Sequence, residues 1–224
     1  MADDWVGDEP HIASTAPDEV PLLHRWIDVA AVVILSLATL STAWSGYQAS
    51  LWDGDQSSKY SQASARRIEA ARAASRADQL TTVDVTLFAN YLNAFATGQQ
   101  ELASFYEARF RSEFKPAFDA WVATNPMTNA DAPSSPFAMP EYRLADRDRS
   151  DQLEAEASTI FDEGEKANER SDAYVLLTVI FASVLFFAGI STGIQWHPAR
   201  FGVIGVGLAL FLYGVVRLAM MPVQ

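Results

Sequence analysis

The chain has 224 residues, half of them hydrophobic, and a formal net charge of −12 at pH 7. It contains no cysteine, which excludes disulfides, thiolate metal sites and cysteine nucleophiles. Its acidic balance argues against binding nucleic acid or anionic lipid through bulk electrostatics, so we expect no nucleic-acid partner.

Residues 1–25 form an acidic tail, rich in Asp, Glu and Pro with few apolar anchors, and we predict that it is disordered. The tail lacks the basic region and the small-residue cleavage site of a secretory signal. We therefore interpret the apolar segment that follows as a retained helix.

Three stretches are strongly apolar and almost free of charge: residues 26–47, 173–195 and 200–221. Each approaches the roughly 20 apolar residues that a helix needs to cross about 30 Å of hydrocarbon. The sequence thus predicts three transmembrane helices, with the lipid bilayer as the first partner. The expected fold class is an all-α integral membrane protein with a helical extramembrane domain, residues 48–172, inserted between spans one and two.

The first part of that domain reads as helix. Residues 58–77 are alanine-rich with Arg and Glu, which favours a helix that packs closely. Residues 81–98 follow with Gly98 as a C-terminal residue, and the predicted apolar face consists of Val85, Phe88, Leu92 and Phe95. A third stretch, residues 99–126, has helical spacing at Leu102, Phe105 or Tyr106, Phe110, Phe114, Phe118 and Trp121. Pro116 predicts a kink or break near Phe114 and Lys115.

Residues 124–148 hold four prolines and predict an irregular connection. A helix resumes after it, with Ser150 as the N-cap candidate, and no break separates it from the second span. Its apolar and small residues step by 3 and 4 in a coiled-coil-like seam: Leu153, Ala157, Ile160, Gly164, Ala167 and Ser171. Because this helix matches residues 55–78 in length, we predict an antiparallel stalk in a helical bundle.

Small residues in the last two spans are candidates for close helix packing. Gly189 and Gly193 are in GxxxG register, and span three carries Gly202, Gly205, Gly207 and Gly214. They fit packing within one chain as well as the interface of a homo-oligomer.

Hydroxyl residues of span one are the candidates for a pore-lining or packing face: Ser36, Thr39, Ser41, Thr42 and Ser45. Ser and Thr can also bond to their own helix carbonyls, so the pattern does not by itself indicate a conduit. Beyond them, Asp53 and Asp55 lack the ligand spacing of a calcium loop, and we interpret them as solvated or as carboxylates at the mouth of an oligomer.

No hydrolase, nucleotide-binding or zinc-protease motif occurs, and the three histidines are scattered without a second ligand at helical spacing. We therefore expect no enzyme, no cofactor and no metal site. Lys and Arg near the span ends are almost balanced. Arg25 adjoins the first span, which favours a cytoplasmic N-terminus and an extracytoplasmic helical domain.

The stretches "TAWSGYQASLWDG", "NADAPSSPFAMPEYRLA" and "FASVLFFAGIST" together resemble a family of bacterial, largely actinobacterial and proteobacterial, three-span membrane proteins. The chain is more distantly similar to DUF4337-type proteins, which share a span, a long helical insert and a terminal hairpin. The resemblance covers residue 26 to the C-terminus. It implies the architecture and a bacterial inner membrane location, but no activity and no functional residues.

Two functions are compatible with these features. The first is a homo-oligomeric membrane scaffold or sensor that acts through its helical domain and meets an envelope protein partner. The alternative is an oligomeric channel or transporter component with span one lining a pore.

Overall fold

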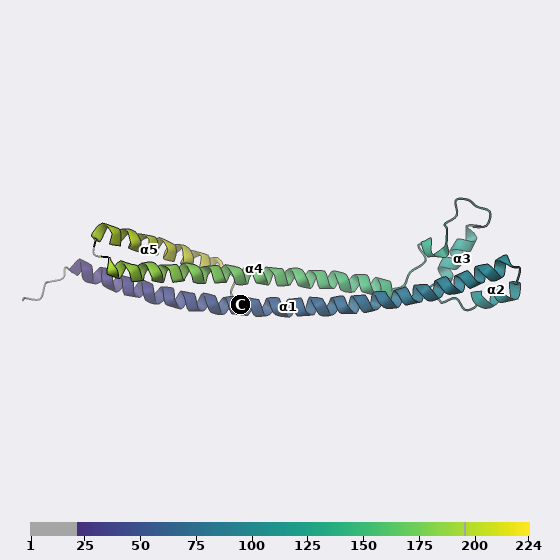
Figure 1. The fold of residues 1–224 in the computed structure, drawn as a ribbon, viewed down its shortest axis with the longest axis horizontal. Helices are drawn as coiled ribbons and strands as arrows, with labels where there is room; N and C mark the ends of the chain where they lie inside the picture. Colours follow the sequence, from purple (N-terminus) through teal and green to yellow (C-terminus); the bar gives the residue numbers. More distant parts are fainter. Residues whose placement is uncertain (1–21, 195) are drawn as a thin grey trace, which may run out of the picture. The chain divides into compact units, whose positions relative to one another are not determined.

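The computed structural model describes residues 22–194 and 196–224, so the predicted disorder of the acidic tail lies largely outside the described residues. The described part is helical and has no strands, which confirms the all-α class. Its helices are drawn in Figure 1 and run in this order: α1 (Leu22–Ala96), α2 (Gln100–Glu107), α3 (Lys115–Ala123), the 3₁₀ turn η1 (Pro136–Ala138), α4 (Ala145–Gly193) and α5 (His197–Met220).

The chain divides into two compact units. The apolar unit contains the described residues up to Ala49 together with Ala173–Gln224, and the polar unit is Ser50–Asp172. The long helices α1 and α4 each contribute to both units.

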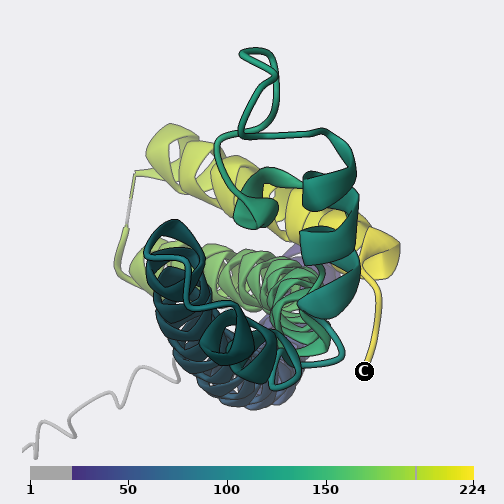
Figure 2. The same ribbon diagram turned by 90° about the vertical axis from the view of Figure 1, so that its right-hand side faces the viewer.

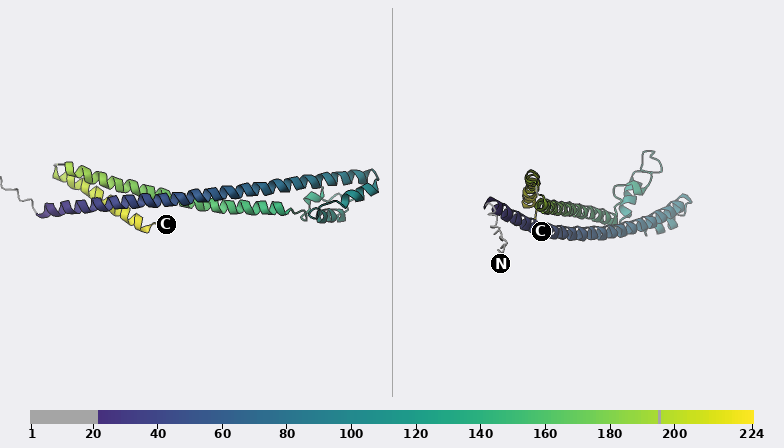
Figure 3. Two further views of the ribbon diagram at one scale, coloured as in Figure 1. Left: turned by 90° about the horizontal axis from the view of Figure 1, so that it is seen from below. Right: turned by 60° about the vertical axis from the view of Figure 1, so that its left-hand side comes forward.

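In the apolar unit, α4 and α5 form an antiparallel hairpin (Figure 3). Two buried glycines of α5 allow close contact: a Cβ added to Gly207 would lie 3.5 Å from Phe187 Cβ, and one added to Gly214 would lie 2.8 Å from Phe181 Cε1. The α1 segment packs on the same pair, with Gly46 facing Thr178. Small residues thus bring the helices together, as expected for helices that associate in lipid.

Within residues 22–194 and 196–224, two helices are long and apolar enough to cross a membrane, α4 through its second half and α5. In their most apolar 18-residue stretches only 22% and 11% of the residues are buried. A core helix of a soluble protein would bury most of such a stretch, so these apolar surfaces face outward. The first predicted span, residues 26–47, includes side chains outside the described residues and stays a prediction.

In the polar unit, α1 and α4 lie side by side and antiparallel over residues 55–78 and 145–172, which we call the stalk (Figure 1). Ion pairs fix the register, including Lys59–Glu163 at 2.5 Å and Arg76–Asp146 at 3.1 Å. These pairs are partly exposed, so solvent screens them and they add little to stability. They confirm the predicted antiparallel pairing.

The seam predicted on α4 is confirmed by burial. Leu153, Ala157 and Ala167 are each at most 3% exposed. The facing residues of α1 are small and buried as well: Ala63, Ala70, Ala73 and Ala77. At Gly164 a Cβ would lie 2.7 Å from the Tyr60 ring, which itself stacks on Phe161 with centroids 4.9 Å apart. The two backbones therefore approach closely because the seam carries small side chains.

Residues 79–144 of the polar unit form the head. Its core joins α1 and α3 through edge-to-face aromatic pairs of Phe88 with Phe114, Phe118 and Trp121. Helix α1 ends before Gly98, whose φ of 71° suits glycine at that position, as predicted. The break expected from Pro116 is also confirmed, because residues 108–114 separate α2 from α3.

Two local expectations were wrong. Ser150 is not the N-cap of the stalk helix, because α4 begins at Ala145, where the main-chain N–H donates to Glu113 Oε1 at 3.3 Å. Asp146 and Asp148 in the first turn also favour that start. The buried side of α1 differs from the predicted apolar face, since Val85 and Phe95 of that face are 44% and 43% exposed.

Candidate functional site

A buried carboxylate lies at the centre of the head. Asp84 on α1 is fully buried, and its Oδ2 accepts a hydrogen bond of 2.9 Å from Arg111 Nη1. The guanidinium belongs to the segment between α2 and α3. A charged pair of this kind is costly to bury and even more costly to break, because either partner alone would be left as an isolated buried charge.

Further polar groups extend this pair to the rest of the head. The Tyr142 hydroxyl donates to Asp84 Oδ2 at 3.1 Å, and it also lies 3.3 Å from Thr81 Oγ1. Arg111 uses its second Nη group on the Glu113 carboxylate, which in turn accepts the N–H at the start of α4. One network thus joins α1, the α2–α3 segment, the irregular connection and α4.

Burial is the main influence on the protonation of Asp84. It raises the pKa of this carboxyl above the ordinary value, and the nearby Arg111 charge and the Tyr142 hydrogen bond only partly oppose it. Asp84 Oδ1 is buried and has no hydrogen-bond partner within residues 22–194 and 196–224. Burial likewise raises the pKa of the Tyr142 phenol.

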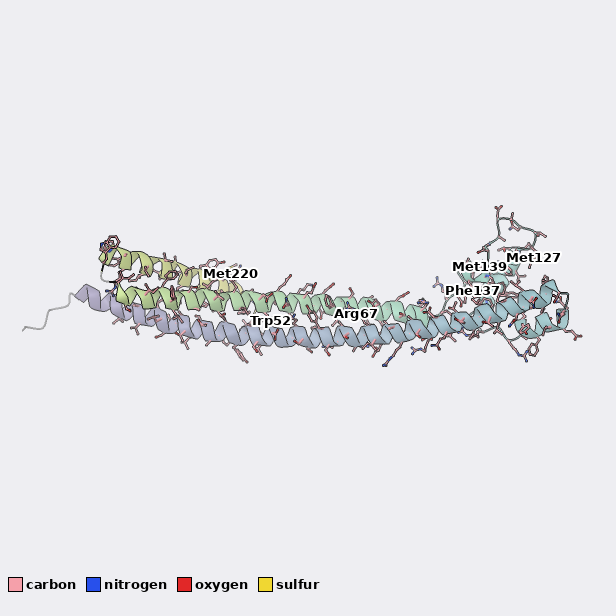
Figure 4. The ribbon with its side chains drawn as sticks, viewed as in Figure 1. Trp52, Arg67, Met127, Phe137, Met139 and Met220 are labelled. Carbon is pink, nitrogen blue, oxygen red and sulfur yellow. The ribbon has the colours of Figure 1, made fainter. Side chains whose placement is uncertain are left out.

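A groove of about 280 Å³ lies beside this core on the surface of the head. Its lining carries no charged side chain: Tyr91, Phe95, Trp121, Val122, Asn125, Pro126, Met127 and Thr128. Val122 and Met127 are 45% and 64% exposed, and Figure 4 shows Met127 on the irregular connection, beyond Phe137 and Met139. An exposed apolar patch of this kind is typical of an interaction surface.

The irregular connection is fixed where it borders the groove. Trp121 Nε1 donates to Pro133 O at 2.7 Å, and Asn129 Nδ2 donates to Thr124 O at 3.0 Å. Asn125 has a φ of 54°, a left-handed conformation that Asn tolerates better than most residues. The connection, which projects from the head in Figure 2, therefore has defined anchors.

The hydroxyl residues of span one do not share one environment. Ser36 and Thr39 are exposed and donate to the carbonyls of Val32 and Leu35 in their own helix. Thr42 donates to Ala38 O at 2.8 Å. Ser41 is half-buried, and Ser45 is fully buried. Their role in a pore or in packing stays a prediction.

None of the remaining predicted site residues belongs to the head. Asp53 is exposed and Asp55 half-buried on α1. Gly189, Gly193, Gly202 and Gly205 are exposed, and a Cβ added to any of them would meet nothing within 4 Å. These glycines make no close contact with the described part of the chain, so their packing between copies stays a prediction.

Asp84 was missed by sequence reasoning. A signal for Asp84 exists, because Ala63, Ala70 and Ala77 recur every seven residues on the buried side of α1 and the next position is Asp84. A charged residue at a position of the buried seam predicts that it forms an ion pair inside the protein. Its partner Arg111 lies 27 residues away, and nothing local indicates it.

Among the described residues, no group of three or more His, Asp or Glu side chains could hold a metal ion. In the polar network of the head, Asp84 Oδ2 instead has Arg111 and Tyr142 as its partners. Comparisons with protein-family models, with curated proteins and with solved structures find no match to this chain.

Proposed function

We propose that this protein is a membrane-anchored, homo-oligomeric scaffold or sensor that acts through its helical extramembrane domain. The observation that carries the proposal is the head, where an aromatic core and a buried ion network hold an uncharged groove at the surface. Rigid support behind an exposed apolar patch suits binding of another protein rather than catalysis.

A three-span anchor is supported by the packing of the apolar unit. Ala31 and Ile34 of α1 line one small cavity together with Ala188 and Ser191 of α4, and Gly46 lies opposite Thr178. This α1 segment therefore runs beside the membrane-length part of α4 over most of its length. Its outer face is also apolar and exposed, with Val32 at 61% and Leu40 at 67%.

An aromatic belt adds to this support. Trp44 and Tyr47 of α1 are 45% and 56% exposed, with ring centroids 6.0 Å apart, near the end of the predicted first span. Aromatic rings with a polar edge favour the membrane–water interface. A bacterial inner membrane, a cytoplasmic N-terminus and an extracytoplasmic helical domain form part of the same proposal.

The oligomer is tested by the mass of the purified chain in mild detergent, measured by light scattering and corrected for bound detergent. We expect a multiple of the 24.6 kDa chain mass. Leu substituted at Gly202 or Gly205 should lower that mass if these exposed glycines pack between copies. A monomeric mass for the unaltered chain would contradict the homo-oligomer.

Binding through the head is tested separately with Met127→Glu, which adds a charge to the groove rim. In cells, chemical cross-linking should yield a protein partner with the unaltered chain and lose it with this variant. Thr82→Glu provides the matched control, because Thr82 is exposed on α1 of the head and does not line the groove. Equal cross-linking by both variants would contradict a role for the groove.

The alternative of a channel or transporter component has no observation of its own, since three hydroxyls of span one bond to their own helix. Ion or solute flux through liposomes that is abolished by Leu at Ser36 and Thr39 would support it over the scaffold.

A further inference from the structure

An extended segment follows α5 and lies against the other two helices of the apolar unit. Met221 has φ −86° and ψ 142°, and residues 222–224 continue without helical structure. Tyr174 Oη of α4 donates to Pro222 O at 3.1 Å. The main-chain N–H of Gln224 donates to Gln48 Oε1 of α1 at 3.2 Å, and Gln48 Nε2 lies 3.5 Å from Gln224 O.

The two side chains that hold this segment are buried. Gln48 is 0% exposed and Tyr174 is 1% exposed. A buried amide needs partners for both its oxygen and its nitrogen, since a polar group left unpaired away from water is destabilising. The main chain of Gln224 offers one donor and one acceptor, which match the two ends of the Gln48 amide.

We propose that Gln48 and Tyr174 form a binding site for the main chain of an extended peptide segment, occupied here by residues 222–224. We call this site the clasp. It holds the end of α5 on α1 and α4, and it shares no residue with the head or with the groove.

The clasp recognises main-chain atoms and no side chain of the segment. All three interactions use Pro222 O, Gln224 N or Gln224 O. The Val223 side chain is 63% exposed and takes no part. Side chains of the segment can therefore change without loss of binding, whereas removal of its N–H or of the Gln48 amide should release it.

Opening of the clasp would leave the two buried side chains that hold the segment without these partners. An open clasp therefore presents an amide and a phenol together. These groups can bind water or a second extended main chain, which makes the clasp a device with two states.

The test uses the absence of cysteine. Val223→Cys in the full chain introduces a single thiol for a nitroxide label at an exposed position, and electron paramagnetic resonance in micelles reports the mobility of the segment. The decisive pair is Gln224→Ala, which keeps the main-chain N–H, and Gln224→Pro, which removes it. We expect an immobilised label with Ala and a mobile label with Pro.

A second pair addresses the receptor side. Gln48→Leu should raise the ratio of mobile to immobilised label about tenfold, because a close main-chain hydrogen bond and a longer one are lost. Gln62→Leu on the exposed side of the same helix should change nothing. Tyr174→Phe keeps the ring and removes one hydrogen bond, so it should have a smaller effect in the same direction.

Equal mobility for Gln224→Ala and Gln224→Pro would overturn the proposal, as would an immobilised label in Gln48→Leu. The Gln224 pair leaves the helices unaltered, so misfolding of Gln48→Leu cannot account for its result. Far-UV circular dichroism on every variant confirms that the helices are intact before mobility is compared.

Discussion

The sharpest test of the stalk is Gly164→Ala. In a helix interior, Ala is favoured over Gly by about 1 kcal/mol, so this change should stabilise α4 if nothing lies nearby. At this position, however, the new Cβ would lie 2.7 Å from two atoms of the Tyr60 ring and 3.2 Å from Lys59 Cβ. Real Cβ atoms do not approach so closely, so the ring or the backbone must move.

The ring is not free to move without cost. Tyr60 stacks on Phe161 with an interplanar angle of 16°, and such a pair contributes about 0.5–1.5 kcal/mol. Overpacking a well-packed seam costs about 1–3 kcal/mol. Set against the gain in helix propensity, we expect Gly164→Ala to destabilise the chain by about 1 kcal/mol.

Gly54→Ala is the matched control, because it lies in the interior of α1 and a Cβ there would meet nothing within 4 Å. It should stabilise by about 1 kcal/mol, so the two variants should differ by about 2 kcal/mol. Thermal unfolding in micelles, followed by circular dichroism, should then show melting temperatures about 4–8 °C apart. When Tyr60 is also replaced by Leu, Gly164→Ala should destabilise the chain less. The reasoning is refuted if Gly164→Ala stabilises as much as Gly54→Ala.

Three further variants test the head and the apolar unit. Burial raises the pKa of Asp84, so the free energy of unfolding should fall as pH rises from the ordinary carboxyl value of 3.8 through the raised pKa. The variant Asp84→Asn should lack this fall. Equal dependence of the free energy of unfolding on pH in both proteins would refute the prediction. Trp121→Phe removes the hydrogen bond to Pro133 O and should cost about 1 kcal/mol in chemical unfolding, with faster hydrogen exchange in the irregular connection; unchanged exchange would contradict its anchoring role. Gly214→Ala meets Phe181 at 2.8 Å and should lower the melting temperature, whereas Gly205→Ala should not; equal effects would contradict the α4–α5 packing.

Features that depend on local spacing were predictable from the sequence. The alternating steps of 3 and 4 from Leu153 to Ser171 predicted a buried seam, and Pro116 predicted a break. Both follow from helix geometry alone, which requires no knowledge of what packs on the seam. The antiparallel pairing of the two stalk helices was predicted from their matching lengths.

Features that depend on distant partners were not predictable in the same way. The start of α4 at Ala145 rather than Ser150 depends on Glu113, which lies 32 residues earlier in the chain. The buried side of α1 in the head includes Asp84, whose charge is neutralised by Arg111. A face predicted from apolar residues alone therefore differs from the buried side. The groove arises from how the irregular connection is anchored on Trp121, and composition alone does not indicate it.

The central claim is a three-span anchor that carries the head on one side of the membrane, and the most direct measurement is the sidedness of single cysteines. The chain has no cysteine of its own, so Ser14→Cys, Met127→Cys, Trp196→Cys and Val223→Cys can each be treated with a membrane-impermeant maleimide in intact spheroplasts. Three spans predict that residues 127 and 223 react from outside, and that 14 and 196 react only after lysis. Reaction of residues 14 and 127 from the same side would remove the first span and contradict the account.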